Sequence, residues 1–317
     1  MIAVDDYASF LATEYLHGYV DDGGAAVKFV VPASDDDAAR LSRTLRERAQ
    51  RAGFAVAGVD AVTTKVHAIE QVFFAISRQI EWDALAYSTA RRALEVAAYP
   101  VADGEDVAVE AVAAIHGVDP RELKRDLDRQ LQALVYRDFA MVQEFRIAML
   151  RLCQAQLRTG QVTDAEHAAI LDWLTGDLRQ ISVLKTALIF RRIARHNARH
   201  LLFSLAHWLA ANGRAGLLLE LDIRRLAQAR RPSAEERSGH YYTKAAVLDA
   251  YEVLRQLVDN TDELSHCCVI AVAAPDFLTD PIRGVDAYQA LKLRIFDEVR
   301  DRRRDNPYSS LIRLGAA

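Results

Sequence analysis

Cysteine is scarce in this sequence of 317 residues, and so are long apolar runs and net positive charge. Its cysteines are Cys153 and the adjacent pair Cys267 and Cys268. Two neighbouring thiols inside an apolar run cannot easily pair with each other, so a disulfide framework is excluded. A chain that folds without such bridges is expected in a reducing compartment.

Secretory and membrane-spanning signals are also missing. No basic residues precede the apolar positions of the N-terminus, and acidic residues interrupt them, which excludes a signal peptide. Even the apolar stretch 201–221 is broken by His207, Arg214 and Glu220, so it is too polar to cross a bilayer. These absences predict a cytoplasmic protein that makes no membrane contact.

The balance of charge excludes a general attraction to nucleic acid. The net charge is −4, so any contact with DNA or RNA requires a local basic patch. Hydrophobic residues make up 51% and charged residues 26% of the chain, which is the balance of a globular protein and excludes a mainly disordered one. The length allows two lobes.

Short apolar runs bounded by turn residues indicate strands. They occupy residues 25–31, 54–60, 216–222 and 267–273, and a short segment at 310–314 completes the set. A helix from Ser34 to Gly53 separates the first two runs, and this spacing predicts that those two strands pair in parallel through a right-handed crossover. Another helix is expected at 286–303, and the polar stretch 228–239 is expected to form an exposed loop.

The pattern between residues 66 and 212 is helical almost throughout. Asp119-Pro120 and Thr163-x-x-Glu166 have the form of helix starts. The sequence therefore predicts an α/β protein whose parallel sheet, like that of P-loop NTPases, is interrupted by a large all-helical insertion. The expected parts are residues 1–65 and 213–317, which form the sheet domain, and residues 66–212, which form the helical lobe.

The turn after the first strand decides whether a phosphate can bind there. A P-loop requires glycines, a lysine and a Ser or Thr, because backbone N–H groups wrap the phosphates. This chain has Pro32-Ala-Ser-Asp-Asp-Asp37 instead, and three carboxylates at a helix N-terminus repel a triphosphate. Gly23 and Gly24 precede the strand, so Lys28 is interpreted as a residue of the sheet.

Acidic residues at the ends of two later strands are candidates for a vestigial cofactor site. The run ending at Asp222 has the form of a Walker B strand, and alternation places Glu220 and Asp222 on the same face. Ile223 follows, so the usual order of acids is absent and a structural role is favoured over metal binding. Asp276 follows the next strand, at the edge where such sheets bind ligands.

The most concentrated basic feature is RRIARHNARH at residues 191–200. On a helix, Arg191, Arg195 and Arg199 would line one face and could grip phosphates of DNA or RNA or an acidic partner. A solvated helix face is an equally good interpretation. His196 and His200 have chelating spacing, but no HExxH or third ligand accompanies them, so no metal is expected.

Other catalytic signatures are missing from the chain. It contains no Gly-x-Ser-x-Gly elbow, no zinc-type cysteine spacing and no Gly-x-Gly-x-x-Gly fingerprint, so hydrolase, zinc and dinucleotide functions lack support. The tyrosines of GHYYTK at residues 239–244 have a composition that suits base stacking, but they are better explained as packing residues. No catalytic residue is assigned.

Four passages together resemble the ATP-binding proteins of BREX-type phage defence, a P-loop group also found beside helicase and TerB-like genes. They are FRRIARHNARHLLFSLAHWLAANGRAGLLLELDI, YYTKAAVLDAYEVLRQLVDNTDEL, CCVIAVAAPDFLTD and RGVDAYQALKLRIFDEV. The resemblance implies Walker B acids at the strand 216–222, and subunit-contacting or sensor arginines at Arg283 or Arg294. The chain departs from this pattern after Val31, where no glycine-lysine loop follows, and at Ile223, where a catalytic glutamate is expected.

The residues and the resemblance lead to two hypotheses. In the first, the chain is a degenerate P-loop NTPase-like subunit of an anti-phage defence system, without enzyme activity, that regulates or scaffolds partner proteins and binds DNA through Arg191, Arg195, Arg199 and His200. Helicase, TerB-like or methyltransferase subunits are the expected partners. In the alternative, it is a divergent ATP-binding switch or ATPase, with ATP and Mg²⁺ as cofactors, that a partner subunit completes.

Overall fold

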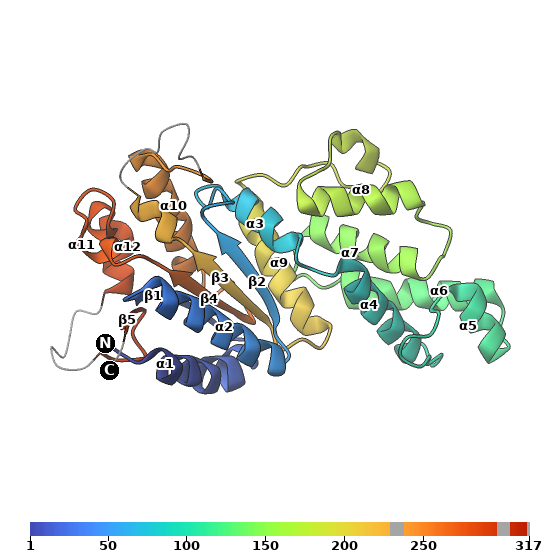
Figure 1. The fold of residues 1–317 in the computed structure, drawn as a ribbon. Coiled ribbons are helices and arrows are strands. Elements are labelled where there is room, and N and C mark those ends of the chain that lie inside the picture. The colour runs from blue at the N-terminus through green and yellow to red at the C-terminus, as the bar shows by residue number, and fades with distance from the viewer. Residues whose placement is uncertain (229–237, 297–304, 316–317) are drawn as a thin grey trace. The chain divides into compact units, whose positions relative to one another are not determined.

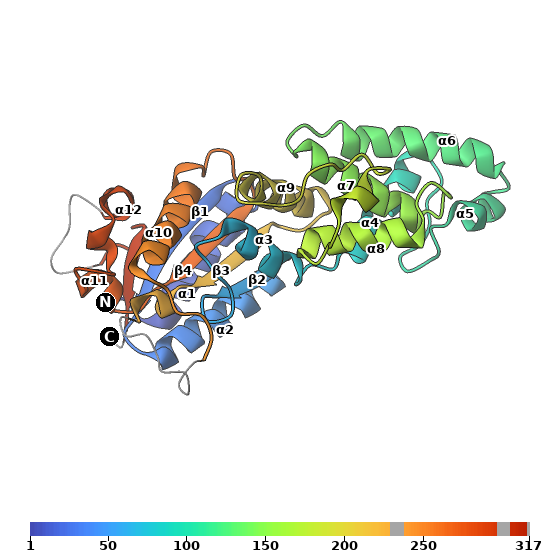
Figure 2. The ribbon, with the colours of Figure 1, turned by 90° about the horizontal axis from the view of Figure 1, so that it is seen from above.

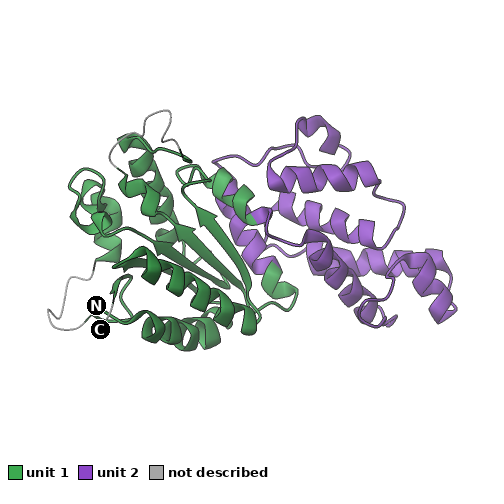
Figure 3. Ribbon diagram, viewed as in Figure 1, with its two compact units in different colours: residues 1–76, 209–317 green, residues 77–208 purple. Residues whose placement is uncertain are grey.

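The computed structural model describes residues 1–228, 238–296 and 305–315. The chain forms two compact units (Figure 3). Residues 1–76 and 209–317 form the first, here called the sheet unit, and residues 77–208 form the second, here called the helical unit. The expected loop at 228–239 and the carboxyl half of the expected helix at 286–303 fall largely outside the described residues.

The sheet unit is built on a five-stranded sheet with strand order β2-β3-β4-β1-β5, and every pair of neighbours is parallel (Figure 1). The strands are β1 (Ala25–Pro32), β2 (Ala55–Asp60), β3 (Leu217–Asp222), β4 (Cys267–Val272) and β5 (Leu311–Leu314). All five agree with the predicted runs to within one residue at each end. The chain from β2 to β3 is helical, which confirms an α/β sheet with a helical insertion.

The expected pairing of the first two strands is wrong. β3 and β4 lie between β1 and β2, so the crossover through α2 (Asp35–Arg51) spans two strands that enter the sheet later. β4 is buried at every residue and pairs with β1 from Ala25↔Cys267 onward. Such a continuously apolar strand is suited to the interior of a parallel sheet, whereas β2, with its partly exposed residues, lies at the edge.

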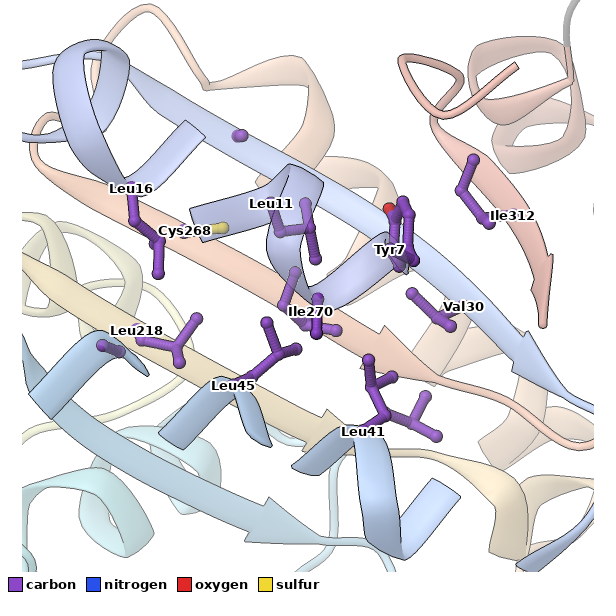
Figure 4. Packing of buried hydrophobic residues seen from close by; sticks show 14 of the residues in the cluster. Tyr7, Leu11, Leu16, Val30, Leu41, Leu45, Leu218, Cys268, Ile270 and Ile312 are labelled. Carbon is purple, nitrogen blue, oxygen red and sulfur yellow. The ribbon is translucent and has the colours of Figure 1, made fainter. Parts of the chain in front are cut away.

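One face of the sheet is covered by α1 (Val4–Phe10), the π-helical segment η1 (Leu11–Val20) and α2. Figure 4 shows Leu11 and Leu41 of these helices directed at Val30 and Ile270 of the sheet, and all four side chains are buried. Alternate residues of β1 point to this face because side chains of a strand alternate between its two sides. Each fully buried leucine of this kind contributes about 1.5–3 kcal/mol.

The opposite face packs against the C-terminal helices, which Figure 2 shows on the side away from α1 and α2. Phe29 stacks on Phe277 with ring centroids 6.0 Å apart, and Tyr251 meets Phe277 edge to face at 5.6 Å. The sheet is therefore covered on both faces, as a parallel sheet requires. The helices of this side are α10 (Lys244–Asp259), α11 (Asp276–Thr279) and α12 (Gln289–Ile295), with the 3-10 turns η4 (Arg224–Ala227) and η5 (Val285–Ala287).

The helical unit packs around an aromatic cluster. The Trp82 ring stacks on Trp208 at 6.2 Å, and Phe145 meets Trp208 edge to face at 6.0 Å. Asp119 and Thr163 cap their helices as predicted. Its elements are α4 (Trp82–Val96), α5 (Val109–His116), α6 (Pro120–Leu131), η2 (Gln132–Tyr136), α7 (Gln143–Gln156), α8 (Asp164–Thr175), η3 (Ile181–Leu184) and most of α9 (Ala198–Ala211), whereas α3 (Ile69–Ser77) lies almost wholly in the sheet unit.

Within the described residues, no helix combines the length and the apolar character needed to cross a membrane.

The three thiols are expected to be unreactive in the folded protein. Cys153, Cys267 and Cys268 are buried and unpaired by disulfides, and burial raises the pKa of Cys153 and of Cys268 to about 12. Since the thiolate is the reactive form, labelling with a maleimide at about pH 8 should be negligible in buffer and complete in guanidinium chloride. Rapid labelling of any cysteine in the native state would contradict this burial.

Candidate functional site at the carboxyl edge of the sheet

The carboxyl ends of β1, β2, β3 and β4 bring several acidic side chains to one edge. Asp60 and Asp222 end neighbouring strands and are register partners. Asp35 follows β1 as the first residue of α2, and Asp276 follows β4 as the first residue of α11. In open parallel sheets, ligands bind outside this edge, so these residues mark the candidate site.

The turn from β1 into α2 is closed by its own side chains. Ser34 is the N-cap residue, and its hydroxyl accepts a hydrogen bond from the Asp37 N–H at 3.1 Å. The Ala33 N–H donates to the Leu314 carbonyl of β5 at 2.8 Å. Two backbone donors next to the helix start are thus already used. The first turn of α2 also carries Asp35, Asp36 and Asp37, as the sequence predicted.

Arg224, which the sequence analysis passed over, supplies the positive charge of the site. It lies just beyond β3, and its Nε donates to both carboxylate oxygens of Asp222 at 3.0 and 3.1 Å. Its Nη2 donates to the same carboxylate at 2.6 Å, and its Nη1 forms an ion pair with Asp35. The hydrogen bonds that Arg224 donates to Asp222 raise the pKa of Arg224, and the nearby carboxylates of Asp35 and Asp60 add to the effect.

This bridge holds a cation between a strand-end aspartate and a helix N-terminus. In P-loop NTPases, the aspartate at this place orders a magnesium ion beside the phosphates. Here the guanidinium of Arg224 is bound to Asp222 on one side and to Asp35 on the other. The signal in the sequence was an arginine two residues after a strand-end aspartate, a spacing that permits a local ion pair but does not reveal that Asp35 joins it.

Glu220 supports the docking of α2 on the sheet. Its carboxylate accepts hydrogen bonds from the Ser42 hydroxyl at 2.8 Å and from Arg46 Nε at 3.1 Å, and it is buried. Gly58, its register partner on β2, lies so close to Arg46 that an added Cβ would come within 2.0 Å of the guanidinium. Glu220 and Asp222 both face α2, as alternation predicts, but Glu220 is engaged in internal packing.

Lys28 is a buried residue of the sheet, as predicted from the sequence. Its ammonium donates to the Tyr15 hydroxyl at 2.7 Å and to the carbonyls of Tyr308 and Ser309 at 2.6 and 3.1 Å. These partners lie near the amino end of β5, away from the carboxyl edge. Lys28 therefore does not take part in the candidate site.

The arginine assigned by resemblance at position 283 is buried inside the sheet unit. Its Nη1 donates to the Tyr242 carbonyl at 3.0 Å and to the Leu226 carbonyl at 3.3 Å, and its Nη2 donates to the Tyr241 hydroxyl at 2.9 Å. The side chain thus joins the segment before α10 to the loop after α11. The two tyrosines act as packing residues here, and a contact of Arg283 with another subunit stays a prediction.

Arg294 belongs to an ion-pair network between α12 and α10. It pairs with Asp259, which also binds Arg255, and Arg255 in turn holds Glu252. The hydrogen bond from Arg255 lowers the pKa of Glu252 to about 2. The guanidinium of Arg294 is half-exposed and anchors α12, while its assignment as a sensor or subunit-contacting residue stays a prediction.

The expected helix over residues 191–200 is wrong, because α9 begins at Ala198. Arg191 and Arg195 lie in the irregular segment before it, so they do not share a helix face with Arg199 and His200. Two contacts hold this segment out of the helix. The Arg191 carbonyl accepts from the Trp173 indole at 2.9 Å, and the Asn197 side chain accepts from the Ala194 N–H at 2.8 Å.

The described parts of the chain contain no cluster of candidate metal ligands. No group of three or more histidine, cysteine, aspartate or glutamate side chains there is arranged to hold an ion. His196 precedes α9 and His200 lies inside it, so the two imidazoles do not lie one turn apart on a single helix.

Comparison with known proteins identifies one family. The profile described as BREX system ATP-binding protein BrxC/D matches residues 15–316, which includes both units and all five strands. No curated protein and no solved structure matches the chain significantly.

Replacing Arg224 with alanine should destabilise the protein by about 1–2 kcal/mol, since charge-assisted hydrogen bonds to a partly buried aspartate are lost. Asp222 and Asp35 would also be left without the cation that lies between them. Arg40→Ala, in α2, is the matched control, because its ion pair with Asp5 is exposed and should contribute little. Denaturant unfolding measures both, and equal stability of the two variants would contradict this role of Arg224.

Proposed function

Because the chain belongs to the family of BREX system ATP-binding proteins BrxC/D, we propose that it is a subunit of this phage-defence system that regulates or scaffolds its partners without hydrolysing ATP. This proposal rests on the guanidinium of Arg224, which is held between Asp222 and Asp35 at the edge where a nucleotide would bind. A magnesium–phosphate group would have to displace it before reaching Asp222.

Electrostatics and backbone geometry support this proposal. The helix N-terminus that would face a phosphate carries three aspartates, and anions near such a charge cluster are repelled despite the helix dipole. The glycine-free turn offers no nest of N–H groups, and the N–H groups of Ala33 and Asp37 already have acceptors. Neither the turn after β1 nor α2 contains a lysine that could contact the phosphates.

Membership in a multi-protein defence system implies that the chain works with other proteins. We infer that helicase, TerB-like or methyltransferase components are its partners and that the two units serve as binding surfaces for them. A sheet of this kind that has lost phosphate binding retains its rigid framework, which is suited to holding other subunits in place.

The alternative function is an ATP-binding switch that a neighbouring subunit completes. The name of the family, BREX system ATP-binding protein, favours it. So does the retention of Asp60, Asp222 and Asp276 at one edge, since carboxylates are the ligands that Mg²⁺ prefers. In this alternative, a partner would have to supply the missing cation for the phosphates and displace Arg224.

Titration of the purified chain with ATP and Mg²⁺ in a calorimeter should give no binding heat, and no phosphate should be released. Asp222→Ala should leave both results unchanged. Magnesium-dependent hydrolysis that is lost in Asp222→Ala would refute the proposal. Binding that appears only when a purified BREX partner is added would instead establish the alternative.

DNA contact is the second part of the proposal, and it is favoured by the cations before α9. Arg191, Arg192 and Arg195 are exposed within a short irregular segment of the helical unit. Exposed guanidinium groups of this kind can contact a phosphate backbone, although they do not form the helical stripe that the sequence suggested.

Arg191→Glu combined with Arg195→Glu should weaken DNA retention and reduce the slope of log affinity against log salt by about 2, one for each lost phosphate contact. Arg121→Glu with Arg125→Glu is the matched control, because these arginines are exposed in the same unit and the change in net charge is identical. Filter binding over a salt series measures the slope. If both double variants behave alike, the segment before α9 is not the DNA contact.

A further inference from the structure

β5 covers only the carboxyl half of β1. The two strands pair from Phe29↔Leu311 to Pro32↔Leu314. The amino half of β1, from Ala25 to Lys28, pairs with β4 on one side. On its other side, no strand of the described part of the chain pairs with it. Half of an interior strand is thereby left as a sheet edge.

The backbone of this half-edge presents a regular set of polar groups. The Phe29 N–H donates to the Ser310 carbonyl at 2.7 Å, and the Ala33 N–H donates to the Leu314 carbonyl at 2.8 Å. Since N–H and C=O groups of a strand alternate between its two sides, those of Ala25 and Val27 point the same way as those of Phe29. In the described residues, no hydrogen bond joins the main chain of Val27 to a partner on this side.

Lys28 prevents β5 from extending over the half-edge. Its ammonium binds the carbonyls of Tyr308 and Ser309, which would otherwise belong to a continuing strand. The Asn306 side chain accepts from the Tyr308 N–H at 3.0 Å and turns the chain there. The buried Lys28 holds the two carbonyls that a longer β5 would present to β1, so the amino half of β1 stays open.

A pocket of about 480 Å³ lies along the half-edge. Tyr15 and Tyr19 of η1 and Val258 at the end of α10 line it together with residues 25–28 of β1. The Glu14 carboxylate, which accepts a hydrogen bond from the Tyr308 hydroxyl at 3.0 Å, lies at the same pocket. The pocket therefore combines strand-edge backbone, aromatic rings and one carboxylate. Lys28, its basic residue, is already held by three oxygens.

We propose that this pocket, here called the β1 groove, binds an extended segment of a partner protein that adds as a strand beside Ala25–Lys28. Donors and acceptors that alternate along an edge are matched by an extended backbone. The tyrosine rings accept an apolar side chain of the segment, and Glu14 is complementary to a Lys or Arg next to it. The inference rests on the proposed partner-binding role and names where that binding occurs.

The experiment uses fluorescent peptides that tile the other proteins encoded in the same BREX system, titrated against the full chain and followed by anisotropy. At least one peptide with an apolar residue beside a basic one should bind. Val27→Pro removes a donor that faces the groove and leaves the pairing with β4, so affinity should fall about tenfold, as for one lost hydrogen bond. Glu14→Lys should weaken the same peptide and favour an acidic variant of it.

Two further variants provide a second test of the groove and a control. Tyr19→Ala changes an exposed ring of the groove and should weaken binding even if Val27→Pro fails to fold. Phe139→Ala, an exposed ring of the helical unit, is the matched control and should bind as the unaltered chain does. Amide exchange adds a direct reading, because an added strand protects the Val27 N–H.

Several results would contradict peptide binding at the β1 groove. If neither Val27→Pro nor Tyr19→Ala changes the affinity for the peptide, the contact lies elsewhere. Full-length partners that still form a complex with the chain, while no peptide binds, would reject the groove but keep the partner-binding role. The absence of any complex would reject both. Self-association that is lost in Val27→Pro would show that the occupant is a second copy of the chain, against the proposal.

Discussion

The ion pairs of Arg224 are the constraint on which the rest of the sheet's carboxyl edge depends. Asp222 ends a buried strand and Asp35 begins a helix, and without a cation these two carboxylates would repel each other. The guanidinium joins them and ties the start of α2 to the end of β3. The same contact places an internal positive charge beside the strand-end aspartate, at the edge where ligands of open parallel sheets bind.

The polar contacts of Glu220 also join α2 to the sheet. Glu220 is used to hold Ser42 and Arg46 of α2, and Gly58 gives the Arg46 side chain room to lie on the sheet. Loss of Arg46 would leave the largely buried Glu220 carboxylate with one hydrogen bond fewer, which costs free energy because a buried charge needs partners. The acidic residues of β3 are therefore engaged in joining sheet and helix.

The two ends of β1 have opposite character. At its carboxyl end, the backbone donors and the nearby charges are satisfied within the chain, through Leu314, Ser34 and Arg224. At its amino end, Lys28 stops β5 early and leaves backbone groups facing a pocket. Unpaired strand edges readily take up another strand. The carboxyl end of β1 is thus closed within the chain, whereas its amino end faces a pocket.

The sequence by itself determined the elements, because apolar runs, caps and turn residues act locally. It located all five strands, the caps Asp119 and Thr163, and the acidic turn after β1. Only the tertiary structure decided the order of the strands, the burial of Arg283 and the role of Arg224, since each depends on residues far apart in the chain. The helix predicted at 191–200 failed for the same reason, because the Trp173 indole binds the Arg191 carbonyl across the helical unit, and no local pattern records such a contact.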